Sequence, residues 1–146
     1  MVLNPDFKEF LQLLNEHEVR YMVIGGYAVA HHGHPRYTKD LDVWLWVSPD
    51  NAKKIIDVLN AFGFGSIGLT EKDFLNAENV VQLGYPPVRI DMTMSISGLA
   101  FEDCYERRDI TSIDDITINF IGLSDLKINK LASGRKRDLD DVENLE

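Results

Sequence analysis

Two aspartates, Asp40 and Asp42, stand at the start of an apolar run that extends to Val47. Residues two apart on a β-strand project from the same face, so both carboxylates are expected on one side of a sheet. Carboxylate oxygens are preferred ligands of hard divalent cations such as Mg²⁺. The spacing therefore predicts a metal site, and such a site could act on a phosphorylated substrate.

A glycine pair upstream of the aspartates points to the same chemistry. The apolar run Tyr21–Ile24 stops at Gly25-Gly26, and an alanine-containing segment follows to His32. This order is typical of a strand, a tight turn and a short helix over about 26–32. Glycine lets a backbone approach a ligand closely, and a helix start offers unpaired N–H groups to an anion such as phosphate.

A third carboxylate, Asp91, lies within the apolar run 88–94. A charged group inside an apolar strand is costly unless it is paired with another charge or binds a metal. We therefore take Asp91 as the third member of the metal site. The alternative is an exposed position on a half-solvated edge strand.

The order of Gly25-Gly26, Asp40-Leu41-Asp42 and a later strand aspartate resembles the polymerase-beta-like nucleotidyltransferases. Within them the chain is most similar to small bacterial proteins related to abortive-infection and toxin–antitoxin nucleotidyltransferases. The resemblance implies an α/β (α+β) fold with a mixed β-sheet, helices packed mainly on one face and the active site on the other. It also implies a cytoplasmic protein.

The resemblance also implies roles for individual residues. Asp40, Asp42 and Asp91 would be catalytic and would bind Mg²⁺, or Mn²⁺ in its place. An NTP would be the substrate. The residues expected to contact its phosphates or the rest of the nucleotide are Gly25, Gly26, Arg36, Thr38 and Lys130. A solvent-exposed loop arginine is the alternative for Arg36.

The implied activity is transfer of an NMP from the NTP to a hydroxyl acceptor, which could be a protein side chain, a tRNA end or a small molecule. The chain leaves no segment for a separate acceptor-binding domain, so a partner protein or a homo-oligomer could complete the site. The alternative function is a non-catalytic or weakly catalytic antitoxin or interaction module that binds Mg·NTP or a partner. A degenerate family member without nucleotide binding is a third interpretation.

Several polar and aromatic residues allow two interpretations. His31, His32 and His34 could bind zinc, but their glycine- and proline-containing loop favours solvated histidines or one that hydrogen-bonds near the substrate. Trp44 and Trp46 alternate with apolar residues, so they could stack on a base or cover the second face of the sheet.

The C-terminal segment from Ser124 contains regularly spaced basic residues. Its similarity to the same bacterial group implies that Lys127 or Lys130, with Arg135, faces the active site or holds the tail against the sheet. A solvated, charged helix is the alternative.

Periodicity and turn residues predict the remaining elements. The expected helices cover about 5–17, 49–62, 71–77, 98–108 and a region that starts at Ser124, where Leu126, Ile128 and Leu131 would supply apolar contacts. The expected strands cover about 21–24, 41–47, 79–83, 88–94, 110–113 and 116–121, with a weak strand or loop at 64–69. A single domain over 1–146 is expected, with a helical tail over about 124–146.

Composition limits the class of protein. The 146 residues are 45% hydrophobic, which suits one folded domain. No apolar run approaches the roughly 18 residues of a membrane span, and the N-terminus lacks the pattern of a secretory signal. The net charge of −9 disfavours extended, nonspecific binding of DNA or RNA. The single cysteine, Cys104, is expected to be a small buried residue, consistent with a reducing cytosol.

Overall fold

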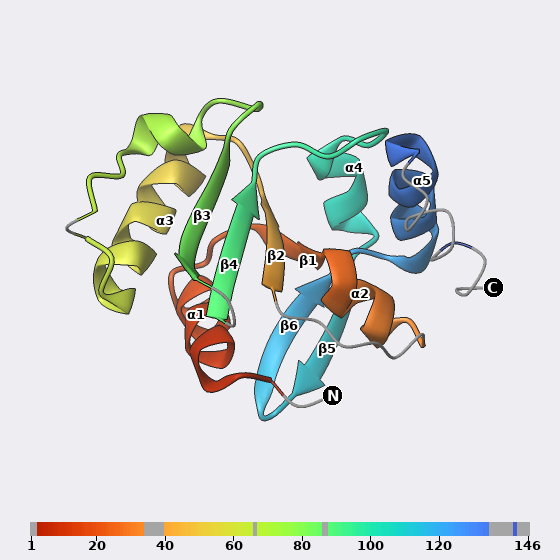
Figure 1. Cartoon of the computed structure of the whole chain (residues 1–146), viewed down its shortest axis with the longest axis horizontal. Coiled ribbons are helices and arrows are strands. Elements are labelled where there is room, and N and C mark those ends of the chain that lie inside the picture. Colours follow the sequence, from red (N-terminus) through yellow and green to blue (C-terminus); the bar gives the residue numbers. More distant parts are fainter. Residues whose placement is uncertain (1–2, 34–39, 66, 86–87, 135–141, 143–146) are drawn as a thin grey trace.

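The computed structural model describes residues 3–33, 40–65, 67–85, 88–134 and 142. These residues form a mixed six-stranded sheet (Figure 1). The strands lie in the order β3 (Val80–Tyr85), β4 (Val88–Thr93), β2 (Asp40–Leu45), β1 (Tyr21–Ile24), β6 (Ile116–Phe120) and β5 (Asp109–Ile113). The β2–β4 and β1–β6 pairs are parallel, and the other three pairs are antiparallel. The expected α+β fold class is confirmed.

Two helices cover one face of this sheet, and each begins with the predicted cap. In α1 (Pro5–Glu16) the side chain of Asn4 accepts a hydrogen bond from the backbone N–H of Asp6. In α3 (Pro49–Phe62) Ser48 has the same role toward the N–H of Asn51. A capping oxygen followed by proline satisfies the free N–H groups of the first turn, which is why both starts were predictable from the sequence.

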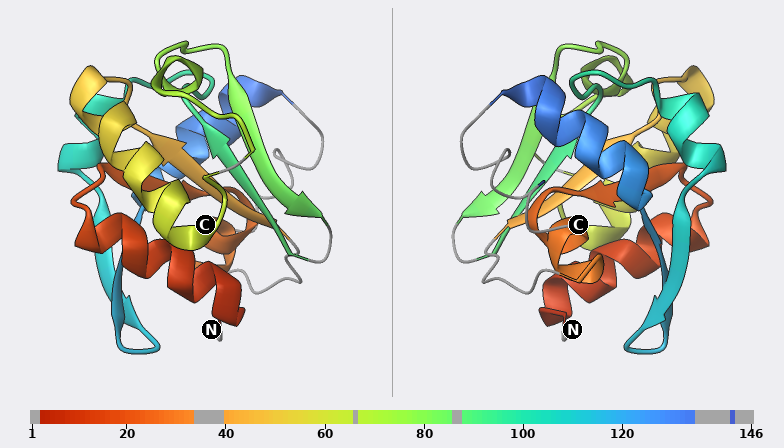
Figure 2. Two further views of the ribbon diagram at one scale, coloured as in Figure 1. Left: turned by 90° about the vertical axis from the view of Figure 1, so that its left-hand side faces the viewer. Right: turned by 90° about the vertical axis from the view of Figure 1, so that its right-hand side faces the viewer.

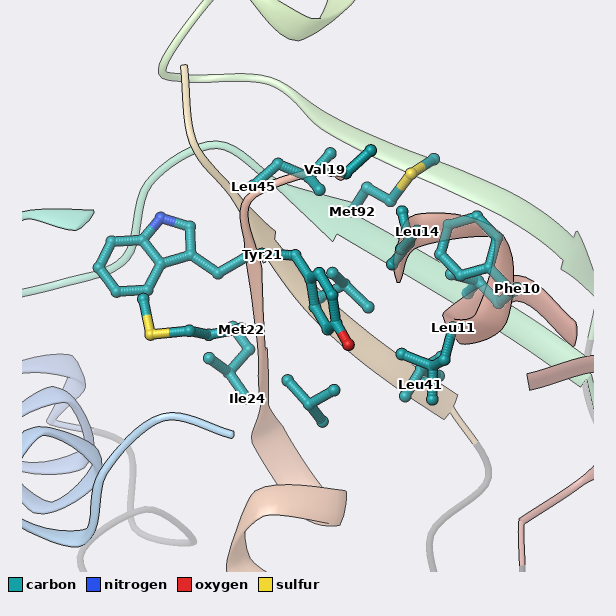
Figure 3. Packing of buried hydrophobic residues seen from close by; sticks show 14 of the residues in the cluster. Phe10, Leu11, Leu14, Val19, Tyr21, Met22, Ile24, Leu41, Leu45 and Met92 are labelled. Atoms are coloured by element: carbon teal, nitrogen blue, oxygen red, sulfur yellow. The ribbon is translucent and has the colours of Figure 1, made fainter. Parts of the chain in front are cut away.

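The main core lies between α1 and the sheet. Figure 3 shows Phe10 and Leu14 of α1 beside Leu41 of β2 and Met92 of β4, all of them buried. Alternation along β2 sends the even-numbered side chains to the other face, so the apolar packing leaves Asp40 and Asp42 away from α1.

The other face carries α4 (Phe101–Glu106) and α5 (Leu123–Ser133). Helix α2 (Gly25–His31) follows β1 directly, and its Tyr27 ring contacts Phe7 of α1. Opposite views show α1 and α3 in front of the sheet on one side and α5 in front on the other (Figure 2). Trp44 is buried on this second face, where its ring meets Phe101 of α4 edge to face at a centroid distance of 5.1 Å. Trp44 therefore covers the sheet, and the packing interpretation is the one that holds for it.

Three helices differ from the predictions in their bounds or their type. Gly98 has a left-handed φ of 84°, and Leu99 forms a bridge with Ile96, so α4 begins only at Phe101. The last helix begins at Leu123 with Gly122 as its N-cap, so Ser124 is not the cap. The short helix predicted at 71–77 is a 3₁₀ turn, η1 (Glu71–Phe74). The described residues of 64–69, predicted as a weak strand or a loop, form no strand.

The apolar face of α5 also differs from the prediction. Leu126 is buried, but Ile128 and Leu131 are 46% and 56% exposed. The inward face instead follows Leu126 to Lys130, which are four residues apart and therefore lie on one side of the helix. The helix covers a polar pocket, so its periodicity does not follow an apolar stripe.

Within the described part of the chain, the helices are all too short or too polar to cross a membrane.

Candidate active site

Parallel pairing of β2 with β4 brings the three predicted carboxylates together. In the register of this pair, Asp42 lies beside Asp91 and Asp40 lies beside Arg89. Side chains two apart share a face, so these four residues form two adjacent cross-strand pairs. One pair is opposite in charge and the other, Asp42 with Asp91, is of like charge. Two adjacent carboxylates repel each other and favour a cation between them.

Arg89 links two of the carboxylates. Its Nη2 donates hydrogen bonds to Oδ2 of Asp40 at 2.8 Å and to Oδ2 of Asp91 at 3.1 Å. The Nε of Arg89 is 3.1 Å from Oδ1 of Asp91, but these two atoms are not aligned for a hydrogen bond. Sequence reasoning missed Arg89 as a site residue. The available signal was an arginine two residues before Asp91 in an otherwise apolar strand, where both side chains must share one face.

The environment of Asp42 disfavours its charged form. Burial, followed by the negative charges of Asp91 and Asp40, raises the pKa of Asp42 from 3.8 to about 6. Arg89 and Lys130 act in the opposite direction and do not offset this rise. A bound cation would remove the repulsion that raises the pKa of Asp42.

The turn after β1 approaches Asp42 very closely. Gly25 has a φ of 65°, and a Cβ atom added there would overlap the carboxylate of Asp42. Ile24 is the register partner of Asp42 across β1 and β2, so the turn begins directly beside the carboxylate. Only glycine suits this backbone conformation and this contact. Gly26 follows as a buried residue in the first turn of α2.

Helix α5 forms the opposite wall. A cavity of about 660 Å³ is lined by Gly25, Gly26 and the three aspartates on one side and by Asn129, Lys130 and Ser133 on the other. Lys130 is only 4% exposed and contributes a favourable charge interaction to Asp42. Lys130 is thus brought to the carboxylates, whereas Lys127, one turn away, does not line this cavity.

Two contacts fix α5 over the cavity. Arg107 donates hydrogen bonds to both carboxylate oxygens of Asp125, at 3.0 and 3.1 Å, and the Asp125 side chain is 4% exposed. Further along, the Asn129 side chain donates to the carbonyl oxygen of Ser97. A Cβ on Gly98 would come within 2.8 Å of the Ala132 side chain. These contacts hold Lys130 in register with the sheet.

The donor set suits a hard divalent cation. All three carboxylates line one cavity, and Oδ1 of Asp91 is buried without a hydrogen-bond partner in the described part of the chain. An acceptor atom of this kind, in a site of oxygen donors, fits Mg²⁺ or Mn²⁺.

The other residues singled out in the sequence either lie outside the described part of the chain or do not line the cavity. Arg36, Thr38, His34 and Arg135 lie outside the described residues. Trp46 does not line the cavity; its Nε1 donates to Glu102, and the Arg20 guanidinium lies 4.7 Å from its ring centroid.

His31 and His32 lie at the far end of α2. The Nε2 of His31 is 2.6 Å from Oδ2 of Asp109, and the Nε2 of His32 is 2.7 Å from the carbonyl oxygen of Ile121. His31, His32 and Asp109 offer ligand-type atoms within 4.8 Å of one another, so a cation could bind there. Their hydrogen bonds already link α2 to the β5–β6 region, which accounts for both histidines without a metal.

Solved structures with the same fold include several nucleotidyltransferase-like proteins. A putative nucleotidyltransferase from Thermotoga maritima is 12% identical, with 98% of this chain and 94% of that one covered and a TM-score of 0.64. The lincomycin-bound lincosamide antibiotic adenylyltransferase LnuA is 17% identical, with 99% and 96% covered and a TM-score of 0.57. An antigenic nucleotidyltransferase-like protein from Paracoccidioides brasiliensis is 17% identical, with 96% and 74% covered and a TM-score of 0.58.

At these low sequence identities the solved structures establish only that the fold is shared. The family is identified by comparing the sequence with models of protein families. No curated protein matches the chain. The model of one protein family matches residues 4–146, which is nearly the whole sequence and includes every residue of the cavity described above. The chain therefore belongs to the family described as nucleotidyltransferase of unknown function (DUF6036).

Proposed function

We propose that this protein is a Mg²⁺-dependent nucleotidyltransferase that moves an NMP from an NTP to a hydroxyl acceptor and releases pyrophosphate. The observation that carries the proposal is the convergence of Asp40, Asp42 and Asp91 on one face of the sheet, opposite Lys130. Family membership supports the reaction class.

The proposed roles follow from position in the cavity. Asp40, Asp42 and Asp91 hold the metal, and Asp91 also accepts the proton of the acceptor hydroxyl. Bound Mg²⁺ or Mn²⁺ would stabilise the charge on the attacking and leaving oxygens. The hydroxyl oxygen bonds to the α-phosphorus, the bond from that phosphorus to the β-phosphate oxygen breaks, and pyrophosphate leaves.

The phosphates would lie between the glycine turn and α5. The backbone at Gly25 and Gly26 is accessible from the cavity, and Lys130 supplies a cation on the opposite wall. Arg36 and Thr38 are proposed as further nucleotide contacts from the sequence. The acceptor would enter from the open side of the cavity. The name of LnuA, an antibiotic adenylyltransferase, supports a small hydroxylated molecule as the first acceptor class to test, before tRNA and protein.

Nucleotide binding provides the first test. Melting temperatures would be measured with ATP, GTP, CTP and UTP, with and without Mg²⁺, for wild type, Asp42→Asn and Asp57→Asn. Asp57 is exposed on α3, so its replacement removes the same charge outside the cavity. We expect Mg²⁺-dependent stabilisation of about 2.7 kcal/mol at a nucleotide concentration 100 times Kd. The effect should persist in Asp57→Asn and disappear in Asp42→Asn.

Transfer of label from an α-³²P-labelled NTP would then establish turnover. Binding without transfer to any acceptor class would favour the alternative, a module that binds Mg·NTP or a partner with little turnover. Failure of all four nucleotides to stabilise the wild-type chain would refute the enzyme as a self-sufficient catalyst.

A further inference from the structure

Arg89 already occupies oxygen atoms that a metal would need. Its Nη2 donates hydrogen bonds to Oδ2 of Asp40 at 2.8 Å and to Oδ2 of Asp91 at 3.1 Å, and its Nε lies 3.1 Å from Oδ1 of Asp91 without a hydrogen bond to it. Mg²⁺ requires carboxylate oxygens at about 2.0–2.1 Å in nearly octahedral geometry. An ion bound through the Oδ2 atoms would compete with the guanidinium for them. An ion bound through the remaining oxygens would still lie close to it, and two positive charges within about 4 Å repel each other strongly in a partly buried site.

The Arg89 side chain is placed so that it can move. Its Cα is fixed by β4, which pairs on both sides, but its side chain is 30% exposed and lines the cavity. The Asp91 side chain is 15% exposed, and that of Asp40 is 30% exposed like Arg89, but both aspartates have short side chains with few rotatable bonds. When a cation enters, the long arginine side chain can therefore rotate, whereas the short carboxylates remain in position.

We propose that Arg89 is a displaceable counter-cation that leaves Asp40 and Asp91 when the metal binds and then pairs with the triphosphate. This inference rests on the proposed function, because it concerns the metal and nucleotide of that site. Its consequence is cooperativity. Metal alone must displace Arg89 from two carboxylates, whereas metal together with a triphosphate provides the displaced guanidinium with new anionic partners. By linkage, each ligand then strengthens the binding of the other.

The chemistry of arginine suits both partners. A guanidinium presents a planar fork of donors that matches carboxylates and phosphates alike, whereas lysine offers a point charge. Lys130 lies across the cavity and is buried, so the triphosphate would meet cations from both walls. Arg89 thus exchanges one set of anionic oxygens for another within the same cavity.

A purely structural role for Arg89 predicts the opposite change in metal affinity when the arginine is removed. If the arginine only holds the carboxylates in place, its removal should loosen the site and weaken metal binding. If it competes with the metal, its removal should strengthen metal binding. The sign of the change in metal affinity therefore distinguishes the two roles without a measurement of activity.

The experiment is a titration with Mn²⁺ in the absence of nucleotide, followed by the electron paramagnetic resonance signal of the free ion. Wild type would be compared with Arg89→Met, Arg89→Gln, Asp42→Asn and the control Arg20→Met, whose guanidinium lies over Trp46 outside the cavity. We expect Arg89→Met to bind Mn²⁺ about tenfold more tightly than wild type. Arg89→Gln should show the same direction, and Arg20→Met should match wild type.

A second titration uses inorganic triphosphate, which requires no base, at saturating Mg²⁺. We expect Arg89→Met to bind it about tenfold more weakly than wild type, because a charge-assisted bidentate contact is lost. Equal or weaker Mn²⁺ binding by folded Arg89→Met and Arg89→Gln, with wild-type binding lost in Asp42→Asn, would overturn this inference alone. Absence of Mn²⁺ binding in wild type and in both Arg89 variants would overturn the proposed function together with it.

Discussion

Replacing Asp42 by asparagine should stabilise the metal-free protein at neutral pH. Burial and the neighbouring carboxylates of Asp91 and Asp40 raise the pKa of Asp42 to about 6. The folded state therefore binds the proton of this carboxyl more tightly than the unfolded chain does, and the charged form destabilises the fold. Asparagine has nearly the shape of the protonated acid and carries no charge, so it should remove that penalty.

The pKa values set the size of the effect. A rise from 3.8 to about 6, at 1.36 kcal/mol for each pKa unit, corresponds to about 3 kcal/mol. Because the folded-state pKa is raised, the carboxyl contributes no penalty below pH 3.8. The penalty grows as the pH rises from about 4 to 6 and is complete above that range. Some solvent reaches the Asp42 side chain, so about 3 kcal/mol is an upper value.

Urea unfolding in the presence of EDTA, at pH values from 4 to 7.5, measures this penalty. The free energy of unfolding of Asp42→Asn should exceed that of wild type by up to about 3 kcal/mol at pH 7.5 and by less than about 1 kcal/mol at pH 4. Asp57→Asn, at an exposed position, should stay within about 0.5 kcal/mol of wild type throughout. Saturating Mg²⁺ should reduce the advantage of Asp42→Asn. An Asp42→Asn variant no more stable than wild type at pH 7.5 would refute the electrostatic argument.

Three further substitutions test the walls of the cavity. Gly25→Ala should lower the free energy of unfolding by about 1–3 kcal/mol and abolish Mg²⁺-dependent stabilisation by nucleotide, since its Cβ would displace Asp42. The control Gly63→Ala is also at positive φ but has open space around it, so it should retain the nucleotide effect. Lys130→Met should weaken nucleotide binding about tenfold in calorimetry, whereas Lys127→Met should not, and equal losses would contradict the assignment of Lys130. Arg107→Ala should lower the free energy of urea unfolding, because it leaves the buried Asp125 carboxylate without its ion-pair partner. The loss should exceed that of Lys54→Ala, which breaks the surface pair with Asp50 and should cost under about 0.5 kcal/mol.

The parts of the site that depend on local sequence were predictable. A strand that ends in a glycine pair is a local pattern, and so is a pair of aspartates two apart at the start of an alternating strand. The first pattern correctly predicted β1 and α2, and the second correctly predicted β2. Alternation along β2 correctly predicted that Asp40 and Asp42 share a face. The caps at Asn4 and Ser48 likewise fixed the starts of two helices, because capping is decided within four residues.

The parts that depend on long-range pairing were not predictable. Arg89 shares a face with Asp91 by local alternation, but its contact with Asp40, 49 positions earlier in the chain, depends on the register between β2 and β4. The inward face of α5 could not be found from hydrophobic periodicity, because the helix covers a polar cavity and turns Lys130 inward in place of Ile128. Periodicity identifies an apolar face and contains no signal for a helix whose buried side is charged.

The charges of the cavity also indicate the order in which its ligands gain affinity. Asp40, Asp42 and Asp91 face two cations, Arg89 and Lys130, among the described lining residues, so the fully ionised site is negative by one charge. It therefore attracts a divalent cation and repels a free triphosphate. Once the cation is bound, the balance becomes positive by one charge, and an anionic nucleotide is attracted. Repulsion between Asp42 and Asp91 destabilises the metal-free protein and favours binding of a cation between the two carboxylates. Such an arrangement is expected of a site selected for ligand binding rather than for stability.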